Sequence, residues 1–173
     1  VCMNPEFLRE GTALDDFLNP DRIVIGELDE KSGDKIEEMY SEFDAPKIRT
    51  SLRAAELIKY VSNSLLATKI SFINEIGNLC KELSIDVYEV ADGVGLDSRI
   101  KRAFLDSGAG FGGSCFPKDV RAVASFMEEQ GLEARILNDT ISVNEDQKTK
   151  LVEQLKEHYS DLSGKTIAVL GLS

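Results

Sequence analysis

The stretch from Leu52 to Leu83 is the feature that most limits how this chain can fold. Apolar residues recur every three or four positions and no proline interrupts them, which predicts one continuous α-helix. About 30 residues rising about 1.5 Å each give a helix about 45 Å long, more than the diameter of a small domain. Such a helix needs burial from elsewhere, so we expect a partner subunit. The repeating positions are Leu57, Val61, Leu65, Thr68, Phe72, Ile76, Leu79 and Leu83.

Shorter elements are expected on both sides of this helix. Asn4-Pro5-Glu6 predicts a helix start, with an N-cap residue before a proline, followed by a turn that ends at Gly11. Asp86 followed by Glu89 predicts a capped helix that runs to about Ala91. The other predicted helices cover 31–43, 98–105, 118–130 and 141–159, and the predicted strands cover 23–26, 47–50 and the run from Lys165.

Both ends of the chain read as pieces of α/β structure. Val1-Cys2-Met3 is typical of the tail of a strand, and residues 1–50 resemble the last third of an α/β domain. The run from Lys165 to Ser173 is typical of a buried strand followed by a glycine turn, which has no sheet to join. We therefore expect a fragment of a longer chain.

Composition excludes several function classes. The net charge of −11 argues against nucleic acid as a partner. No apolar run approaches about 20 residues, so no membrane span is expected, and the first residues lack the pattern of a signal peptide. The 3 cysteines are unevenly spaced and give no disulfide framework, which favours a reducing cytoplasm.

Cys115 stands at the end of a glycine-rich loop and just before a proline that can open a helix. The loop Gly108–Gly113 has 4 glycines in 6 residues, so its backbone can approach a ligand closely. The helix dipole and Lys118 favour the thiolate, and Asp119 can fold back toward the thiol. Cys115 is thus either a nucleophile or, like many intracellular cysteines, a small buried hydrophobe.

Other polar residues also allow both a functional and a purely structural interpretation. Lys59 and Asn63 are four apart on one helical face, and could equally be solvated surface residues. Glu6 and Glu10 have the same spacing and could simply favour a helix N-terminus. Arg99 would by default be a surface charge at a helix start.

Five motifs occur in order along the chain: Asn4-Pro-Glu-Phe-Leu-Arg-Glu-Gly-Thr12, Lys59-Tyr-Val-Ser-Asn63, Asn74-Glu75, Asp97-Ser-Arg99 and Phe111-Gly-Gly-Ser-Cys-Phe-Pro-Lys-Asp119. Taken together, these motifs closely resemble the UDP-glucose/GDP-mannose dehydrogenase family, and the resemblance covers essentially the whole chain. It implies a mainly α fold, in which residues 51–160 would form a central helical dimerisation domain with a very long helix, flanked by α/β remnants of two Rossmann-like domains. Residues 1–50 would end the NAD-binding domain, and 161–173 would be the first strand of a nucleotide-sugar-binding domain.

The resemblance implies an NAD-dependent oxidation of a sugar C6 alcohol to an aldehyde and then to a carboxylate. Cys115 would form a thiohemiacetal and then a thioester, which holds the reactive aldehyde in place. Lys59 would stabilise the oxyanion, and Asp119 with Lys59 and a water would manage the first proton. Glu6 would activate the hydrolytic water, and Asn63 would orient substrate and oxyanion.

The resemblance also implies binding residues. Glu10 and Lys118 would touch NAD, and Arg99 would reach into the site of a partner subunit in a homodimer. No metal is expected. The remaining expected substrate contacts are Phe7, Leu8, Phe104, Leu105, Asp106, Ser107, Gly108 and Gly112.

The sequence also departs from the family pattern. No glycine cluster follows a strand near the start, as a phosphate-binding G-x-G-x-x-G would. Asp106 replaces a lysine found in some relatives. Residues 25–29 and 44–46 are similar to the GDP-mannose branch, whereas residues 95–99 are similar to the UDP-sugar branch.

We expect UDP-glucose as the substrate, with GDP-mannose or a UDP-N-acetylhexosamine as alternatives. A different class of function is an isolated dimerisation module without activity of its own. A cysteine hydrolase would lack a histidine base, since His158 lies in a polar C-terminal helix.

Overall fold

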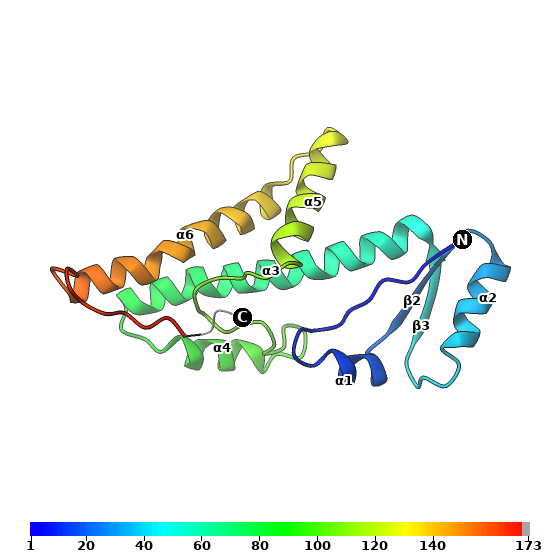
Figure 1. The fold of residues 1–173 in the computed structure, drawn as a ribbon, viewed down its shortest axis with the longest axis horizontal. Helices are drawn as coiled ribbons and strands as arrows, with labels where there is room; N and C mark the ends of the chain where they lie inside the picture. Colours follow the sequence, from blue (N-terminus) through cyan, green and yellow to red (C-terminus); the bar gives the residue numbers. More distant parts are fainter. Residues whose placement is uncertain (171–173) are drawn as a thin grey trace. The chain divides into compact units, whose positions relative to one another are not determined.

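One helix, α3 (Leu52–Glu82), is the longest element of the chain, as its apolar repeat predicts (Figure 1). The computed structural model describes residues 1–170. The chain divides into two units, which are described separately. The first comprises Val1–Leu66 and Ser114–Ala134, and the second comprises Ala67–Gly113 and the residues from Arg135 onward.

The first unit contains a small mixed sheet. Strand β2 (Ile23–Glu27) lies between β1 (Cys2–Met3), which is antiparallel to it, and β3 (Lys47–Ser51), which is parallel. Helix α2 (Glu30–Met39) connects β2 to β3 and packs against β1 and β2. The unit also contains α1 (Ala13–Leu18) and α5 (Phe116–Glu129).

Both faces of β2 are buried, and each is covered by a different helix. Val24 and Ile25 are fully buried. Alternate residues of a strand point to opposite faces, so Ile25 and Glu27 face α2. Gly26 faces the start of α3, where an added Cβ would lie 2.5 Å from the Ala55 Cβ and 3.1 Å from the Leu52 Cα. Helix α3 therefore packs directly on the backbone of the central strand.

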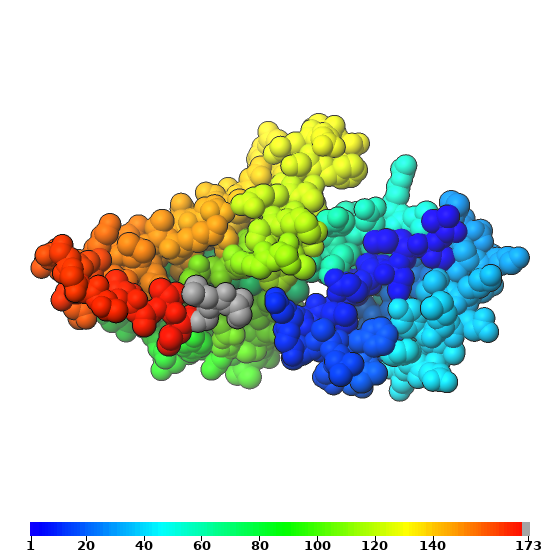
Figure 2. Space-filling view, in the orientation of Figure 1, coloured from blue at the N-terminus to red at the C-terminus, as the bar shows by residue number. Residues whose placement is uncertain are grey.

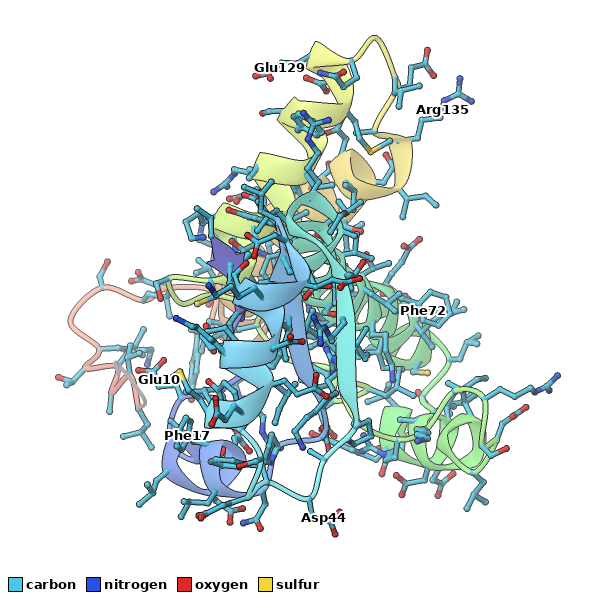
Figure 3. The ribbon with its side chains drawn as sticks, turned by 90° about the vertical axis from the view of Figure 1, so that its right-hand side faces the viewer. Glu10, Phe17, Asp44, Phe72, Glu129 and Arg135 are labelled. Carbon is cyan, nitrogen blue, oxygen red and sulfur yellow. The ribbon has the colours of Figure 1, made fainter. Side chains whose placement is uncertain are left out.

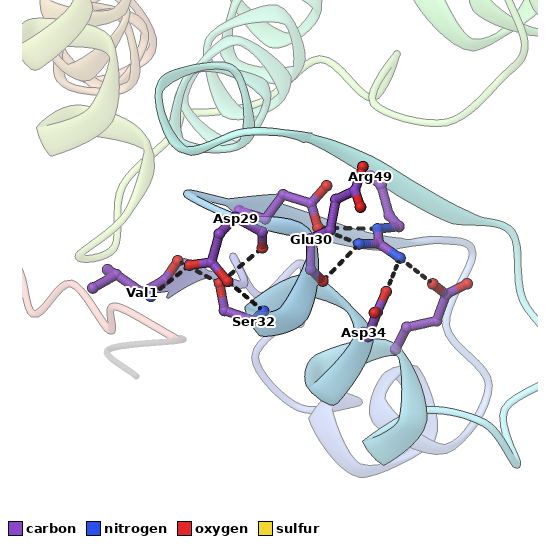
Figure 4. Close-up of polar contacts among 8 residues, drawn as sticks. Val1, Asp29, Glu30, Ser32, Asp34 and Arg49 are labelled. Atoms are coloured by element: carbon purple, nitrogen blue, oxygen red, sulfur yellow. Dashed lines mark hydrogen bonds and ion pairs between the residues drawn. The ribbon is translucent and has the colours of Figure 1, made fainter.

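An ion-pair cluster around Arg49 closes the other face (Figure 4). The Arg49 guanidinium donates to the carboxylates of Glu27 at 2.6 Å and Asp34 at 2.6 Å, joining β2 and β3 to α2. A Cβ on Gly33 would overlap the Glu27 carboxylate, so the glycine leaves room for this pair. One guanidinium thus serves three carboxylates, since Glu37 also accepts from it at 3.1 Å, and these hydrogen bonds raise the pKa of Arg49.

The second unit packs α4 (Val87–Gly95) and a long loop around the C-terminal half of α3, together with α6 (Arg135–His158). Ile73 of α3, Ala91 of α4 and Leu105 of the loop form its buried core. Helix α6 is exposed along the face drawn in orange in Figure 2. Leu151 and Val152 on this helix are among its exposed apolar side chains.

The mainly α fold class is confirmed, and so are the strands at 23–26 and 47–50. The capped helix after Asp86 is confirmed as well, because the Asp86 carboxylate accepts from the Tyr88 N–H. Three helices differ in extent from their predicted ranges. Helix α2 ends at Met39, α4 continues to Gly95, and α6 begins at Arg135.

Three predicted elements are wrong. Asn4 does not start a helix, because its side chain donates to the Val24 carbonyl and accepts from Tyr40. Residues 98–105 form turns, since Lys101 and Phe104 have left-handed backbones that a helix excludes.

The third is the strand expected from Lys165. Residues 165–170 are irregular and have no strand beside them, and a strand forms only by pairing. The remainder of that prediction, 171–173, lies outside the described residues. The predicted domain boundaries at 50 and 160 stay a prediction.

Gly26→Ala should destabilise the protein by about 1–3 kcal/mol, because the added methyl has no space between β2 and α3. Thermal or urea unfolding measures this. Gly93→Ala is the matched control: it lies in α4, and nothing lies within 4 Å of its added Cβ. Equal stability of the Gly26→Ala protein and the wild type would contradict this packing.

Candidate active site

Cys115 is exposed and occupies the N-cap position of α5. Its carbonyl accepts from the Asp119 N–H at 2.9 Å, which is the first turn of the helix. The Cys115 side chain makes no cap hydrogen bond to the helix, and the thiol lies at the positive end of the helix dipole. The Ser114 hydroxyl lies 3.6 Å from the sulfur. The thiol is therefore reachable and lies in an electropositive setting, not in an apolar core.

Asp119, one turn into α5, is a buried carboxylate with two partners. Its side chain is 3% exposed. Asn63 of α3 donates to it at 2.6 Å, and Lys118 forms an ion pair with its other oxygen. The hydrogen bond to Asp119 raises the pKa of Lys118. A buried carboxylate needs such partners, and they fix Asp119 between α5 and α3.

Lys59 lies one turn before Asn63 on the same face of α3 and binds the N-terminal segment. Its ammonium lies 3.1 Å from the Glu6 carboxylate, and its side chain is 16% exposed. The other oxygen of Glu6 accepts from the Leu8 N–H at 2.6 Å.

The electrostatics of Glu6 follow from these contacts. Burial raises the pKa of its carboxylate, but the hydrogen bonds from Leu8 and Lys59 lower it, and the net pKa lies below the ordinary value of 4.5. The charge of Asp119 also acts on Glu6 and raises its pKa. Glu6 is therefore ionised at neutral pH.

The first unit thus brings together all the residues predicted to act chemically. Contacts link Glu6 to Lys59, and Asn63 to Asp119, while α3 carries Lys59 and Asn63 on one face and α5 carries Asp119 and the thiol. The arrangement holds a thiol, an ammonium, an amide and two carboxylates, which together can add to a carbonyl and move protons. These residues are Cys115, Lys59, Asp119, Asn63 and Glu6.

Arg22 also belongs to this cluster, although the sequence gave no reason to select it. Its guanidinium stacks on Phe7, with the Cζ 4.0 Å from the ring centroid, and it donates to Ser62 of α3 at 3.2 Å. The Lys59 ammonium lies 5.5 Å from the same ring. Arg22 precedes β2 and carries no motif, so only the folded chain shows this contact.

Tyr60 was likewise missed. Its ring lies 5.6 Å below the Lys118 ammonium. Its position directly after Lys59 is the only signal that the sequence offered. The remaining first-unit residues predicted to bind ligands, Leu8 and Glu10, lie in the exposed segment that leads to α1, where Figure 3 shows Glu10.

The other predicted substrate residues lie in the second unit. Leu105 is buried in the core against Ile73, so only its backbone can meet a ligand. Asp106 pairs with Arg102 at 2.7 Å. Arg99 is 86% exposed and bonds Asp97 of its own turn, which leaves its guanidinium at the surface. Phe104 has a left-handed backbone, with φ of 66°.

Ser107 packs against Gly77 of α3, and Gly108 is held by Asn74 and Gln147. Gly112 has open space at its Cα. The run Gly108–Gly113 has the letters G-x-G-x-x-G, but it follows turns instead of a strand. It therefore lacks the strand–loop–helix setting of a phosphate-binding loop.

Among residues 1–170, no cluster of three or more His, Cys, Asp or Glu side chains could hold a metal ion. Within the same residues, every helix is too short or too polar to cross a membrane.

The chain matches two family models. Residues 53–146 match the central domain of the UDP-glucose/GDP-mannose dehydrogenase family, and residues 1–44 match the NAD binding domain of that family. UDP-glucose 6-dehydrogenase TuaD of Bacillus subtilis is 50% identical over 173 residues, which is 100% of this chain and 38% of the relative. The chain thus spans well under half of that protein.

Two solved structures are also similar to this chain. A UDP-glucose dehydrogenase from Pyrobaculum islandicum is 50% identical, with a TM-score of 0.93 over 95% of this chain and 38% of that one. A GDP-mannose dehydrogenase from Pseudomonas aeruginosa is 42% identical, with a TM-score of 0.57 over 92% of this chain and 37% of that one. The matched models and these identities establish that the chain belongs to the UDP-glucose/GDP-mannose dehydrogenase family.

Proposed function

We propose that this chain is part of an NAD-dependent nucleotide-sugar 6-dehydrogenase that oxidises UDP-glucose to UDP-glucuronate. The observation that carries the proposal is the cluster around Cys115, in which an exposed thiol at a helix N-terminus shares one unit with the Asn63–Asp119 and Lys59–Glu6 pairs. The similarity to enzymes named UDP-glucose dehydrogenase favours this substrate over GDP-mannose and UDP-N-acetylhexosamines.

The first oxidation converts the C6 alcohol into an aldehyde. The hydroxyl proton passes through a water to Asp119, whose carboxylate Asn63 and Lys118 hold in place. Lys59 stabilises the negative charge that develops on the C6 oxygen. NAD, when bound, supplies the hydride acceptor for both oxidations.

Cys115 then captures the aldehyde. The thiolate sulfur adds to C6, and the oxygen takes a proton, which gives a thiohemiacetal. Loss of a hydride and a proton leaves a thioester. Covalent capture keeps the reactive aldehyde in the site while the reduced cofactor leaves and a second oxidised one binds.

Hydrolysis releases the product. Glu6, ionised because its pKa is low, takes a proton from a water that attacks the thioester carbonyl. Lys59, in contact with Glu6, stabilises the tetrahedral oxyanion. The thiolate leaves as the carboxylate forms, so each sugar consumes one water and reduces two NAD.

Glu10 and Lys118 suit one edge of the cofactor. A carboxylate can accept from ribose hydroxyls, and an ammonium can pair with phosphate. Sugar-nucleotide contacts would come from Phe7 and Leu8 and from the loop that contains Phe104, Ser107 and Gly112. We place the enzyme in the cytoplasm, because a reducing compartment keeps the exposed Cys115 thiol free.

The protein acts as a homodimer in this proposal, with α3 at the interface. The fully buried residues of α3 are small or polar except for Ile73, whereas several of its large apolar residues are exposed. Phe72 is 56% exposed and projects from the helix in Figure 3. Exposed apolar stripes mark interfaces, and two-fold pairing is the commonest assembly. The exposed stripe is Leu57, Val61, Leu65, Phe72, Leu79 and Leu83.

The substrate assignment is tested with the full-length dehydrogenase that contains this chain. Purified enzyme is given NAD with UDP-glucose, GDP-mannose or UDP-N-acetylglucosamine, and NADH is followed by absorbance. We expect two NADH per UDP-glucose and a much lower kcat/KM for the other sugars. The isolated 173 residues should produce none, because they lack a cradle for the pyrophosphate.

Cys115→Ser in the full-length enzyme should lower turnover by about 10³-fold or more, because the weaker nucleophile stalls the reaction before a thioester forms. Mass spectrometry should then find no sugar adduct on the protein. Cys2→Ser on β1 is the control and should keep its activity. Wild-type rates and two NADH per sugar in the Cys115→Ser enzyme would refute the nucleophile assignment.

Glu6→Gln should destabilise the protein near neutral pH by removing the ionised partner of Lys59. The folded-state pKa of Glu6 lies below 4.5, so its contribution is present above that value and is lost as the pH falls through the lower folded-state pKa. Urea unfolding of both proteins across this range should show the stability difference shrinking toward zero. A difference that is independent of pH would count against the ion pair.

Phe72→Glu should convert the dimer into a monomer, because a carboxylate in the apolar stripe cannot be buried at low cost. Sedimentation should report about twice the chain mass of 19.1 kDa for the wild type and a single chain for the variant. Lys81→Glu, half a turn away from the stripe, is the control. A concentration-independent wild-type monomer would rule out this interface.

A further inference from the structure

Two residues of the loop before α5 have both of their backbone hydrogen-bonding groups held by side-chain amides of the second unit. The Gly108 N–H donates to the Asn74 Oδ1 at 2.7 Å, and the Gly108 carbonyl accepts from the Gln147 Nε2 at 2.7 Å. Asn74 is on α3 and Gln147 is on α6. Helices α3 and α6 therefore each hold one backbone group of Gly108.

The Asn144 side chain alone holds both backbone groups of Phe111. Its Oδ1 accepts from the Phe111 N–H at 2.6 Å, and its Nδ2 donates to the Phe111 carbonyl at 3.0 Å. This pattern pairs one side-chain amide with one residue's backbone, as a neighbouring strand would. We call Asn74, Asn144 and Gln147 the amide clamp.

The clamp is buried and its amides are oriented. Its three side chains are between 0% and 4% exposed. The Gln147 Oε1 accepts from Asn78 at 2.9 Å, so the Gln147 amide cannot rotate without losing a bond at each end. Gln147 and Asn144 are each fixed by two hydrogen bonds, and Asn74 by the bond from the Gly108 N–H.

The loop is also shaped to fit the clamp. Gly110 has a φ of +99°, and an added Cβ there would lie 2.6 Å from the Asn144 Oδ1. A Cβ on Gly77 of α3 would lie 2.2 Å from the Ser107 hydroxyl. Only glycines at these positions let the loop and the two helices approach so closely.

We propose that the amide clamp is a positioning device that pre-forms the loop 104–112 to receive the sugar nucleotide. This inference rests on the proposed function, which gives that loop its ligand. A pre-formed loop does not lose backbone entropy when the substrate binds. The clamp therefore acts on substrate affinity and not on the chemical steps at Cys115.

The test compares Asn144→Ala and Asn144→Asp with the wild type in the full-length enzyme. The aspartate retains the acceptor for the Phe111 N–H but puts an oxygen in place of the donor to its carbonyl, so it tests the donor separately and is the second variant if alanine prevents folding. We expect the KM for UDP-glucose to rise about tenfold or more in the alanine variant, which loses both hydrogen bonds to Phe111. The aspartate variant should show at least as large a rise, because its oxygen faces the Phe111 carbonyl, and kcat per titrated active site should stay within about twofold in both variants.

Two further readouts separate positioning from general damage. The Kd for UDP-glucose, measured by calorimetry without NAD, should rise in parallel with KM, while the KM for NAD stays constant. Hydrogen exchange of the peptide that contains Phe111 should accelerate in both variants. Ser142→Ala, exposed on α6 and away from the clamp, is the control and should match the wild type.

If the Asn144 variants show fewer active sites but an unchanged KM and Kd for UDP-glucose, the positioning role is overturned, since such a result describes only a less stable protein. Loss of kcat at constant KM would overturn it as well. Both results leave the proposed function standing, because the wild type still oxidises UDP-glucose. Wild-type enzyme that neither binds nor oxidises a nucleotide sugar overturns the proposed function, and this inference with it.

Discussion

The buried hydrogen bond between Asn63 and Asp119 is the contact on which the candidate site depends. It joins α3 to α5 at 2.6 Å although 56 residues separate the two in the chain. A buried carboxylate without a partner would cost several kcal/mol, so Asp119 fixes where the first turn of α5 lies against α3. That turn carries Cys115 at its N-cap, and the same face of α3 carries Lys59. One polar contact thereby sets the positions of a thiol and a cation.

The composition of α3 serves two kinds of packing. Inward positions such as Ala55, Ala67 and Ser71 are small, which lets other segments approach the helix backbone. Asn63 and Asn74 supply polar contacts to α5 and to the loop before it. Ile73 is buried in the core, but large apolar residues such as Leu57, Leu65 and Phe72 face outward. This inverts the usual expectation that the large apolar stripe of a helix faces its own core. The helix is thus organised around backbone approach on one side and an exposed apolar surface on the other.

Side-chain amides recur wherever irregular backbone must be held. Asn4 holds the N-terminal segment to β2, and Asn144 with Gln147 holds the loop before α5. Segments without regular structure cannot pair their own backbone groups, so a fold that uses them near a ligand needs such donors and acceptors from neighbouring helices. These two segments are irregular and are nevertheless fixed.

The amino-acid sequence was enough to predict the long helix, the strands at 23–26 and 47–50 and the spacing that pairs Lys59 with Asn63 and Cys115 with Asp119, because periodicity and i,i+4 geometry are local properties. It could not show that Arg22 stacks on Phe7, that Leu105 turns into a core, or that residues 98–105 form turns instead of a helix. It also gave the wrong role to Asn4, whose amide is used 20 residues away instead of capping a helix. Each of these points depends on contacts made in the folded chain, whose free energy exceeds local preference.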